Sequence, residues 1–372
     1  MPLLVGGVLE LPLGVLAGEG RRRRLAVLGG GLLFILTLLG VASARSFGVL
    51  LAAFVAFYPA SGAFVSLTQA DLMDVWPERQ AKVMARWELA GSAGAVTGPL
   101  LLTVVLAAGG SWRDGYLVLA AAAALTWLGM AAPGPAKGRQ AGAGSQAGAT
   151  DEGDSDEDDS DEDGTGEEGP RGWREQTRAV LAALRTPDTV RWLLLIEVAD
   201  LLVDVFTGFG GLYLVDVGHL SPAVAAVGIA IRLGAALAAG AALVVVLERI
   251  ADLTVLRVTA ASALVLYPAF LIVPGPVGKL VVLALLSAST ASWYPLLQAR
   301  LYGSLPGRSS VAVTLSSAAA LAGGLGPLAV GLVAQAFGLS AALTGLAAVP
   351  VVVLLGTARA RHQTGDSTGG RE

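Results

Sequence analysis

Two copies of one short stretch, 229 residues apart, decide how this chain folds. The first is Gln69-Ala-Asp-Leu-Met-Asp-Val-Trp-Pro-Glu-Arg79, and the second is Gln298-Ala-Arg-Leu-Tyr-Gly-Ser-Leu-Pro-Gly-Arg308. Five positions are identical without a gap, and each copy ends a long apolar segment. An internal repeat at a fixed offset sets the architecture of a chain. This repeat predicts two structurally related halves.

The segments between the two copies are apolar and long enough to cross a bilayer, which takes about 20 helical residues. The chain is 54% apolar and 15% charged, with a mean hydropathy of +0.68, whereas soluble domains are about 25% charged. A soluble globular enzyme is therefore excluded, and without period-two alternation a β-barrel is disfavoured. Eleven helical spans are predicted, over residues 2–18, 25–43, 47–69, 86–108, 115–132, 190–213, 222–247, 253–273, 278–301, 309–335 and 339–357.

The positions of Lys and Arg predict the orientation of these spans. If Arg21 to Arg24 face the cytoplasm, then 21 of the 25 basic residues lie on that side, and only Arg45, Arg113 and Lys279 lie opposite. Cytoplasmic loops carry the excess of basic residues in membrane proteins. The pattern predicts a multi-pass protein of the cell membrane with its C-terminus in the cytoplasm and Met1 outside.

The negative net charge of −4 belongs to one internal segment. Residues 151–168 hold 12 of the 29 acidic residues, which leaves 25 basic against 17 acidic elsewhere, a balance of +8. Part of this run fits a calcium loop, but Pro170 stands where that loop needs a glutamate. The segment has nothing apolar to bury. A disordered cytoplasmic linker is predicted, followed by a short surface helix from Trp173 to Arg185. The predicted divisions are a five-span bundle over 1–133, the linker over 134–187, a six-span bundle over 188–358 and a tail over 359–372.

The repeat offset also predicts which helix the first half lacks. Six predicted helices separate the two copies, so both halves run in the same direction, as in a six-plus-six transporter. Moving the span 190–213 back by 229 residues places it before residue 1. Eleven spans of an expected twelve are therefore present. The favoured explanation is that the chain begins about forty residues late, and a true eleven-helix variant is the alternative.

Over its membrane-embedded length the chain resembles the major facilitator superfamily. The stretch Gly14-Val-Leu-Ala-Gly-Glu19-Gly-Arg21-Arg22-Arg-Arg is similar to the family's loop motif between its second and third helices, with Gly18 in place of Asp and Glu19 one position later. The resemblance implies a role in gating, although these arginines also set topology.

A glycine–proline motif is the second point of resemblance. Gly94-x-x-x-Gly98-Pro99 is similar to the family's antiporter-associated motif, and Gly326-Pro327 is its counterpart in the second half. The resemblance of this motif implies a transporter that exports its substrate. Helix bending and close packing are the alternative role.

Acidic residues inside the spans are the candidate coupling sites, because an ionisable group at mid-membrane is costly. Glu197, Asp200 and Asp204 are spaced by three and four residues, which places them on one helix face at depths of roughly 9 to 20 Å, at ~1.5 Å per residue. Arg232 in the next span is the expected counter-ion. A purely structural Asp–Arg pair is the alternative. Glu10 is the matching acid of the first half.

Aromatic residues in two spans are the candidate substrate surface. Phe209 and Tyr213 lie in a glycine-rich section beyond the acids, and Trp293 and Tyr294 lie in a polar section of a later span. Such side chains suit an amphiphilic substrate. An interfacial aromatic belt is the alternative.

These features together predict a secondary transporter that exports a small amphiphilic or cationic molecule in exchange for protons, with Asp200 and Asp204 as coupling acids. An uptake permease on the same fold is the first alternative, and a receptor or membrane-embedded enzyme is the second. With no Cys and only two His, no thiolate or His-rich metal site is expected, and no cofactor. No phosphate-binding loop of an ATP-driven pump is present. The expected partners are the substrate, the proton and the lipid bilayer, without nucleic acid, and the protein is expected to be a monomer.

Overall fold

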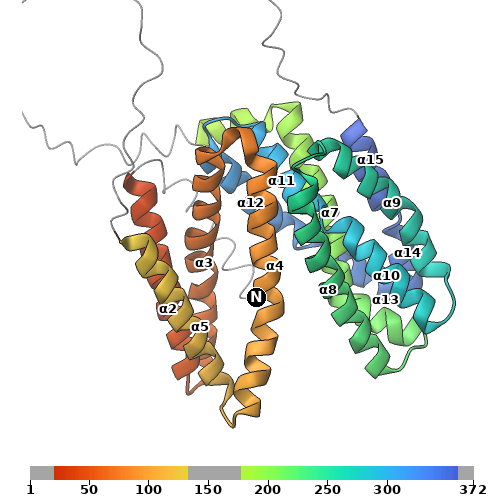
Figure 1. The fold of residues 1–372 in the computed structure, drawn as a ribbon, viewed down its shortest axis with the longest axis horizontal. Helices are drawn as coiled ribbons and strands as arrows, with labels where there is room; N and C mark the ends of the chain where they lie inside the picture. The colour runs from red at the N-terminus through yellow and green to blue at the C-terminus, as the bar shows by residue number, and fades with distance from the viewer. Residues whose placement is uncertain (1–20, 133–176, 359–372) are drawn as a thin grey trace, which may run out of the picture.

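The computed structural model describes residues 21–132 and 177–358, and these residues are helical with short connections (Figure 1). Nine helical stretches among them are long and apolar enough to span a membrane. Helix α7 (Pro187–Leu212), which carries the three acids, is long enough to be a tenth span. The predicted span 2–18 and most of the predicted linker lie outside the described residues. The predicted surface helix is helical over 177–184, the part that is described.

The first half is a bundle of four long helices. They are α2 (Arg21–Ser43), α3 (Phe47–Val75), α4 (Gln80–Ala107) and α5 (Trp112–Ala131), with the 3₁₀ turn η1 (Pro77–Arg79) between α3 and α4. Close approach of α2 and α3 requires Gly30, because a Cβ there would lie 2.6 Å from the Cβ of Ala63. The Trp127 indole of α5 donates a hydrogen bond to the Leu28 carbonyl of α2 at 2.7 Å.

One helix start was predicted six residues too late. The apolar pattern predicted a span from residue 86, whereas α4 begins at Gln80. Lys82 and Arg86 lower the hydropathy of the first turns without preventing helix formation, because both are good helix formers. The helix therefore extends beyond its apolar section.

The second half contains more helices and the larger buried core. It consists of α7 (Pro187–Leu212) with the π-helical turn η2 (Tyr213–Val217), α8 (Pro222–Val246), α9 (Asp252–Ile272), α10 (Pro276–Thr290), α11 (Trp293–Gly303), α12 (Ser309–Gly323), α13 (Gly326–Phe337), α14 (Leu339–Gly345) and α15 (Ala348–Ala358). Its core is built around the fully buried Trp293, Tyr267 and Phe270.

Three predicted spans are each divided into two helices. The divisions fall after Thr290, after Gly323 and after Gly345. A proline lies shortly after each division: Pro295 is five residues after the first, Pro327 four after the second and Pro350 five after the third. Proline cannot donate a hydrogen bond to the carbonyl four residues earlier, and its ring clashes there. Each break therefore lies at the turn that its proline disrupts.

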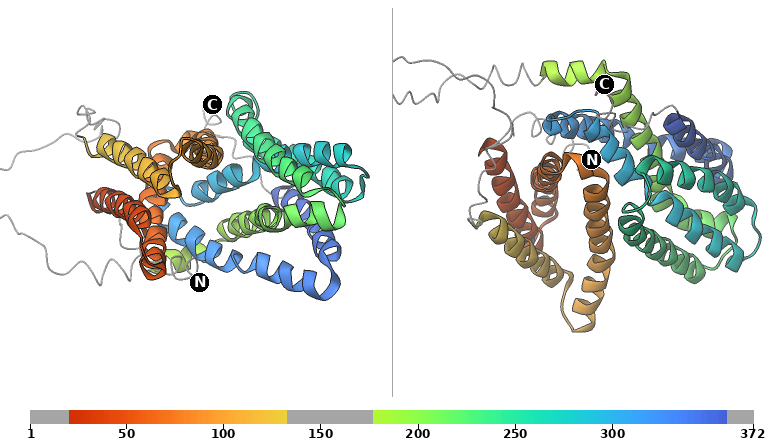
Figure 2. Two further views of the ribbon diagram at one scale, coloured as in Figure 1. Left: turned by 90° about the horizontal axis from the view of Figure 1, so that it is seen from below. Right: turned by 45° about the horizontal axis from the view of Figure 1, so that its top comes forward.

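The two halves meet at one end of the molecule, which we call the basic end because α2 begins there at Arg21. A second buried cluster joins the halves at this end: Leu67, Met73 and Met84 come from the first half, and Tyr302 and Leu315 from the second. The halves lean together at the top of Figure 1 and diverge towards the bottom, and Figure 2 shows the same arrangement from two other sides.

An arginine near the start of α2 also links the halves. The Arg23 guanidinium lies 3.1 Å from Asp71 and 2.8 Å from Asp74, both on α3. It donates a further hydrogen bond to the Ser309 hydroxyl of α12 at 2.6 Å. Ser309 in turn donates to Asp74. The contact is buried on the arginine side, with 6% of its side chain exposed.

Candidate functional site

A cavity of about 800 Å³ lies between the two halves. Its walls come from α3 in the first half and from α7, α11, α12 and α13 in the second. The polar lining residues are Tyr58, Ser66 and Gln69 of α3, Glu197, Asp200 and Asp204 of α7, Tyr294, Gln298 and Tyr302 of α11, and Ser316 and Ser317 of α12. No Lys or Arg lines the cavity among the described residues. The charged groups of its described lining are therefore all acidic, and the rest of the wall is largely apolar.

The three acids of α7 all reach this cavity. Glu197, Asp200 and Asp204 follow the three- and four-residue spacing that keeps side chains on one helix face. Within the described residues, none of them forms a hydrogen bond or an ion pair. A small residue makes room for the first: a Cβ at Gly323 of α12 would overlap the Glu197 carboxylate.

A fourth acid, Glu88 of α4, was not predicted. Its carboxylate is near enough to Asp200 and the Tyr294 hydroxyl to affect their electrostatics, so an acid of the first half lies in the neighbourhood of the acids of the second. Glu88 has no hydrogen-bond or ion-pair partner among the described residues. Glu88 lies inside the predicted span 86–108, two residues after its first residue, and the sequence argument did not single it out. Its apolar neighbours Trp87 and Leu89 were the available signal.

Two glutamines related by the repeat line the cavity, one from α3 and one from α11. Gln69 donates to the Met84 sulfur at 3.5 Å, and Gln298 donates to the Ser316 hydroxyl at 3.2 Å. The Oε1 atom of Gln298 is buried without a partner in the described structure. The repeat matched these two residues, but it gave no reason to place them in a site.

Of the four aromatic candidates, only Tyr294 lines the cavity. The adjacent Trp293 is buried in the core with 1% of its surface exposed, because neighbouring residues on a helix point about 100° apart. Phe209 packs against the same core, and Tyr213 lies under the ammonium group of Lys279, 5.2 Å from the ring centre. These three side chains stabilise the second half instead of contacting the cavity.

Arg232 does not pair with the acids of α7, contrary to the expected counter-ion. It donates to the Thr207 hydroxyl at 3.1 Å and borders a separate small cavity that includes Leu202 and Phe206. Thr207 lies seven residues, close to two full helical turns, after Asp200. Arg232 therefore contacts α7 beyond the acids and forms no ion pair with them in the described structure.

The motif residues at the start of the chain are only partly described. Glu10, Gly14 and Glu19 lie outside the described residues. Helix α2 begins at Arg21, and Arg22 is exposed. The arginine that links the halves is Arg23, which sequence reasoning had grouped with its neighbours as a determinant of topology.

The two copies of the glycine–proline motif have different structures. Gly94, Gly98 and Pro99 lie in the uninterrupted α4, and a Cβ at either glycine would meet nothing within 4 Å. Gly326 and Pro327 instead begin α13 after the break in the helix, and Pro327 lines the cavity. Only the second copy therefore shapes the cavity wall.

Comparisons with known proteins agree on one family. A family model described as Major Facilitator Superfamily matches residues 1–314. No curated protein matches.

Three solved structures are similar in fold. The transporter FucP in the outward conformation has a TM-score of 0.72 and 15% identity, and the match covers 96% of this chain and 87% of FucP. The proton:xylose symporter XylE has a TM-score of 0.67 and 11% identity, with 95% and 83% covered. The human organic anion transporter MFSD10 has a TM-score of 0.64 and 19% identity, with 95% and 82% covered.

Proposed function

This chain belongs to the major facilitator superfamily of multi-pass membrane transporters, and from that membership we propose that it exports a small cationic or amphiphilic molecule in exchange for protons. The observation that carries the proposal is the cavity between the halves, whose described lining holds three acids and no base. An acid at mid-membrane without a counter-charge is costly when ionised, so it is stable there when it has bound a proton or a cation.

The arrangement of the halves supports alternating access. Parallel repeats of this type work by rocking one bundle against the other around a fixed site. The buried cluster closes the basic end, and the helices diverge at the other end. By the excess of basic residues we assign the basic end, with the linker and the C-terminus, to the cytoplasm. The structure then represents an outward-facing state, like that named for FucP.

The charge of the cavity favours a cation over an anion. MFSD10 is named an organic anion transporter, but an anion in this cavity would meet three carboxylates and no lysine or arginine of the described lining. The hydroxyl and amide groups of Tyr294, Gln69 and Gln298 supply hydrogen bonds to a polar substrate. We therefore propose a cationic substrate that also carries hydrogen-bonding groups, handled by a monomer.

Uptake is the second candidate, and one finding favours it. Both XylE and FucP, the latter from E. coli, are named as proton symporters of sugars. A cavity with two glutamines, three tyrosines and three serines also offers hydrogen bonds to sugar hydroxyls. In a symporter the same acids would load a proton together with the substrate.

Transport in reconstituted vesicles with an imposed pH gradient tests the proposal. The full chain is screened with organic cations, sugars and organic anions, and accumulation is measured with the gradient in both orientations. Exchange of a cation against protons supports the proposal. Accumulation of a sugar along with protons identifies a symporter instead, and transport that ignores the pH gradient contradicts proton coupling.

A further inference from the structure

A second cavity, separate from the central one, lies at the basic end, where the end of α3, the start of α4 and the residues after α8 meet. Its volume is about 640 Å³, and it shares no lining residue with the central cavity. We call it the α4 groove. It is lined by Leu72, Trp76, Arg79, Lys82, Val83, Arg86, Trp87, Ala90 and Glu248.

The charged side chains of the α4 groove carry a positive balance. Arg79, Lys82 and Arg86 are spaced by three and four residues, which brings them to one side of η1 and α4. None of the three forms a hydrogen bond or ion pair within the described residues. The single acid of the lining is Glu248, which follows α8.

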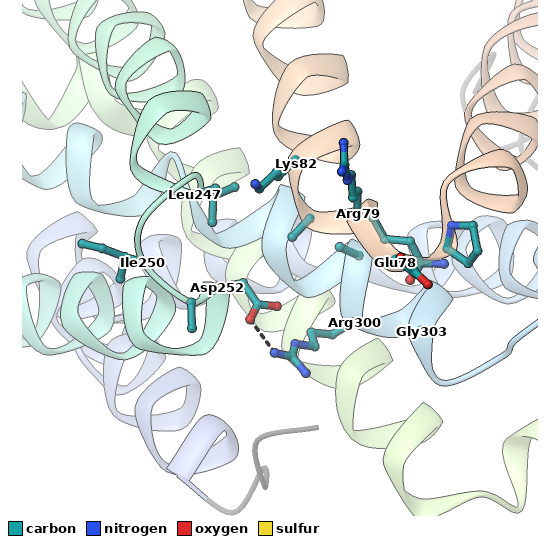
Figure 3. A pocket seen from close by; sticks show the side chains of 13 residues that line it. Glu78, Arg79, Lys82, Leu247, Ile250, Asp252, Arg300 and Gly303 are labelled. Carbon is teal, nitrogen blue, oxygen red and sulfur yellow. Dashed lines mark hydrogen bonds and ion pairs between the residues drawn. The ribbon is translucent and has the colours of Figure 1, made fainter. Parts of the chain in front are cut away.

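A smaller cavity of about 280 Å³ adjoins the α4 groove and shares Arg79 and Lys82 with it (Figure 3). Its other basic residue, Arg300, is already neutralised by Asp252 at 2.5 Å, the contact dashed in Figure 3. The remaining acid of the smaller cavity is Glu78, which forms no ion pair within the described residues. The α4 groove does not include Glu78, so the balance of positive charge is larger on the α4 side.

The remaining walls of the α4 groove are apolar and aromatic. Leu72, Val83 and Trp87 form the wall, and Trp76 is 48% exposed at the end of α3. Tryptophan beside lysine and arginine at a helix end is typical of the membrane–water interface. A ligand that fills this groove must therefore present both an anionic group and apolar surface.

We propose that the α4 groove binds an anionic phospholipid, with the headgroup phosphate between Arg79, Lys82 and Arg86 and the acyl chains along Val83 and Trp87. Basic pockets between membrane helices on the cytoplasmic side bind anionic headgroups. A free anion would leave the apolar walls exposed. The acidic stretch 151–168 of this chain contains no apolar residue, so it would leave them exposed too.

Quenching of tryptophan fluorescence by brominated lipids tests this site in the full chain. The protein is placed in bilayer discs that contain brominated phosphatidylglycerol or brominated phosphatidylcholine at equal mole fraction. We expect a preference for the anionic lipid of roughly tenfold or more in apparent affinity, since each basic residue attracts anionic lipid. The double variant Trp76→Phe, Trp87→Phe removes both tryptophans of the groove, and it should remove most of the preferential quenching and so locate it there.

Two sets of variants separate a site from general surface charge. The triple variant Arg79→Gln, Lys82→Gln, Arg86→Gln should lose the preference, and the single variant of the exposed Arg86 should reduce it if the triple variant does not fold. The matched control neutralises Arg24, Arg178 and Arg185, which are exposed and line neither cavity. This control should keep the preference.

Three results would overturn the proposal. The first is equal quenching by the two lipids, and the second is an equal loss in the control triple variant. The third is a preference for the anionic lipid that is seen only after residues 151–168 are deleted. That result would mean that the chain's own acidic segment occupies the groove. An unchanged preference after that deletion supports the lipid.

Discussion

Individual acids and the residues that make room for them determine the chemistry of the central cavity. Asp200 and Asp204 lie on its wall without a counter-charge among the described residues, while Arg232 donates a hydrogen bond to Thr207, further along α7. Glu88 brings a further carboxylate close to Asp200 from the first half. This composition is the basis of the proposed binding of protons or cations.

Replacing Asp200 or Asp204 with Asn should uncouple transport from the pH gradient. The amide is close in size to the carboxylate but cannot bind or release a proton. We expect gradient-driven flux to fall about tenfold or more, which corresponds to ~1.4 kcal/mol of lost coupling free energy, while exchange without a gradient continues. Asp188→Asn, at the exposed start of α7, is the matched control. Unchanged gradient-driven flux in both cavity variants would refute the assignment of these acids.

Gly323→Ala should displace the Glu197 carboxylate at little cost in stability. A Cβ at this position overlaps that carboxylate, which is the far end of a flexible side chain beside the open cavity. We therefore expect the free energy of unfolding to fall by less than about 1 kcal/mol, below the usual cost of overpacking a core. The midpoint of thermal unfolding measures the change, and Gly94→Ala, with nothing within 4 Å, is the control. A larger loss that Glu197→Ala relieves would show that the carboxylate is held in place.

At the scale of helices, the repeat places one ion pair at equivalent positions of each half. The basic and acidic residues of the pair have exchanged places between the two halves. Arg23 and Asp71 join α2 to α3, and the residues 229 positions later, Asp252 and Arg300, join α9 to α11. The same geometry therefore tolerates either polarity. In the first half the arginine also reaches Ser309 of the other half, whereas the Asp252–Arg300 pair stays within its own half.

Exchanging the charges of the second pair tests whether its geometry or its polarity matters. Asp252→Asn should lower the free energy of unfolding by about 1 kcal/mol, the loss expected for a partly exposed charged hydrogen bond. The double variant Asp252→Arg, Arg300→Asp should recover most of that loss, because the pair re-forms with the polarity of Arg23 and Asp71. Chemical denaturation in detergent measures both. No recovery in the double variant would show that the polarity is fixed by the surroundings.

At the scale of the molecule, closure of the basic end separates two sides of the transporter. The buried cluster and the Arg23–Ser309 contact hold the halves together there, and the helices diverge at the other end. A transporter of this type must open these contacts once per cycle.

Cross-linking across the closed end should therefore stop transport. A Cβ at Gly240 of α8 lies 3.7 Å from the Leu89 side chain of α4, and the chain has no native cysteine to interfere. Leu89→Cys with Gly240→Cys, joined by a short bifunctional thiol reagent, should abolish flux. Gly40→Cys with Ala53→Cys joins α2 to α3 within one half, with 3.5 Å between the two Cβ positions, and should leave flux intact. Full flux in the cross-linked first pair would contradict rocking of the halves.

The sequence by itself determined the membrane class, the parallel repeat and the acidic face of α7, because hydropathy, the repeat offset and helical spacing are properties of residues near one another in the chain. Only the tertiary structure decided which aromatic faces the cavity, where Arg232 binds, and that Glu88 and the two glutamines belong to the site. Those positions depend on how helices rotate against one another. A rotation of about 100°, one residue along a helix, moves a side chain from the core to a cavity wall, as it does for Trp293 and Tyr294.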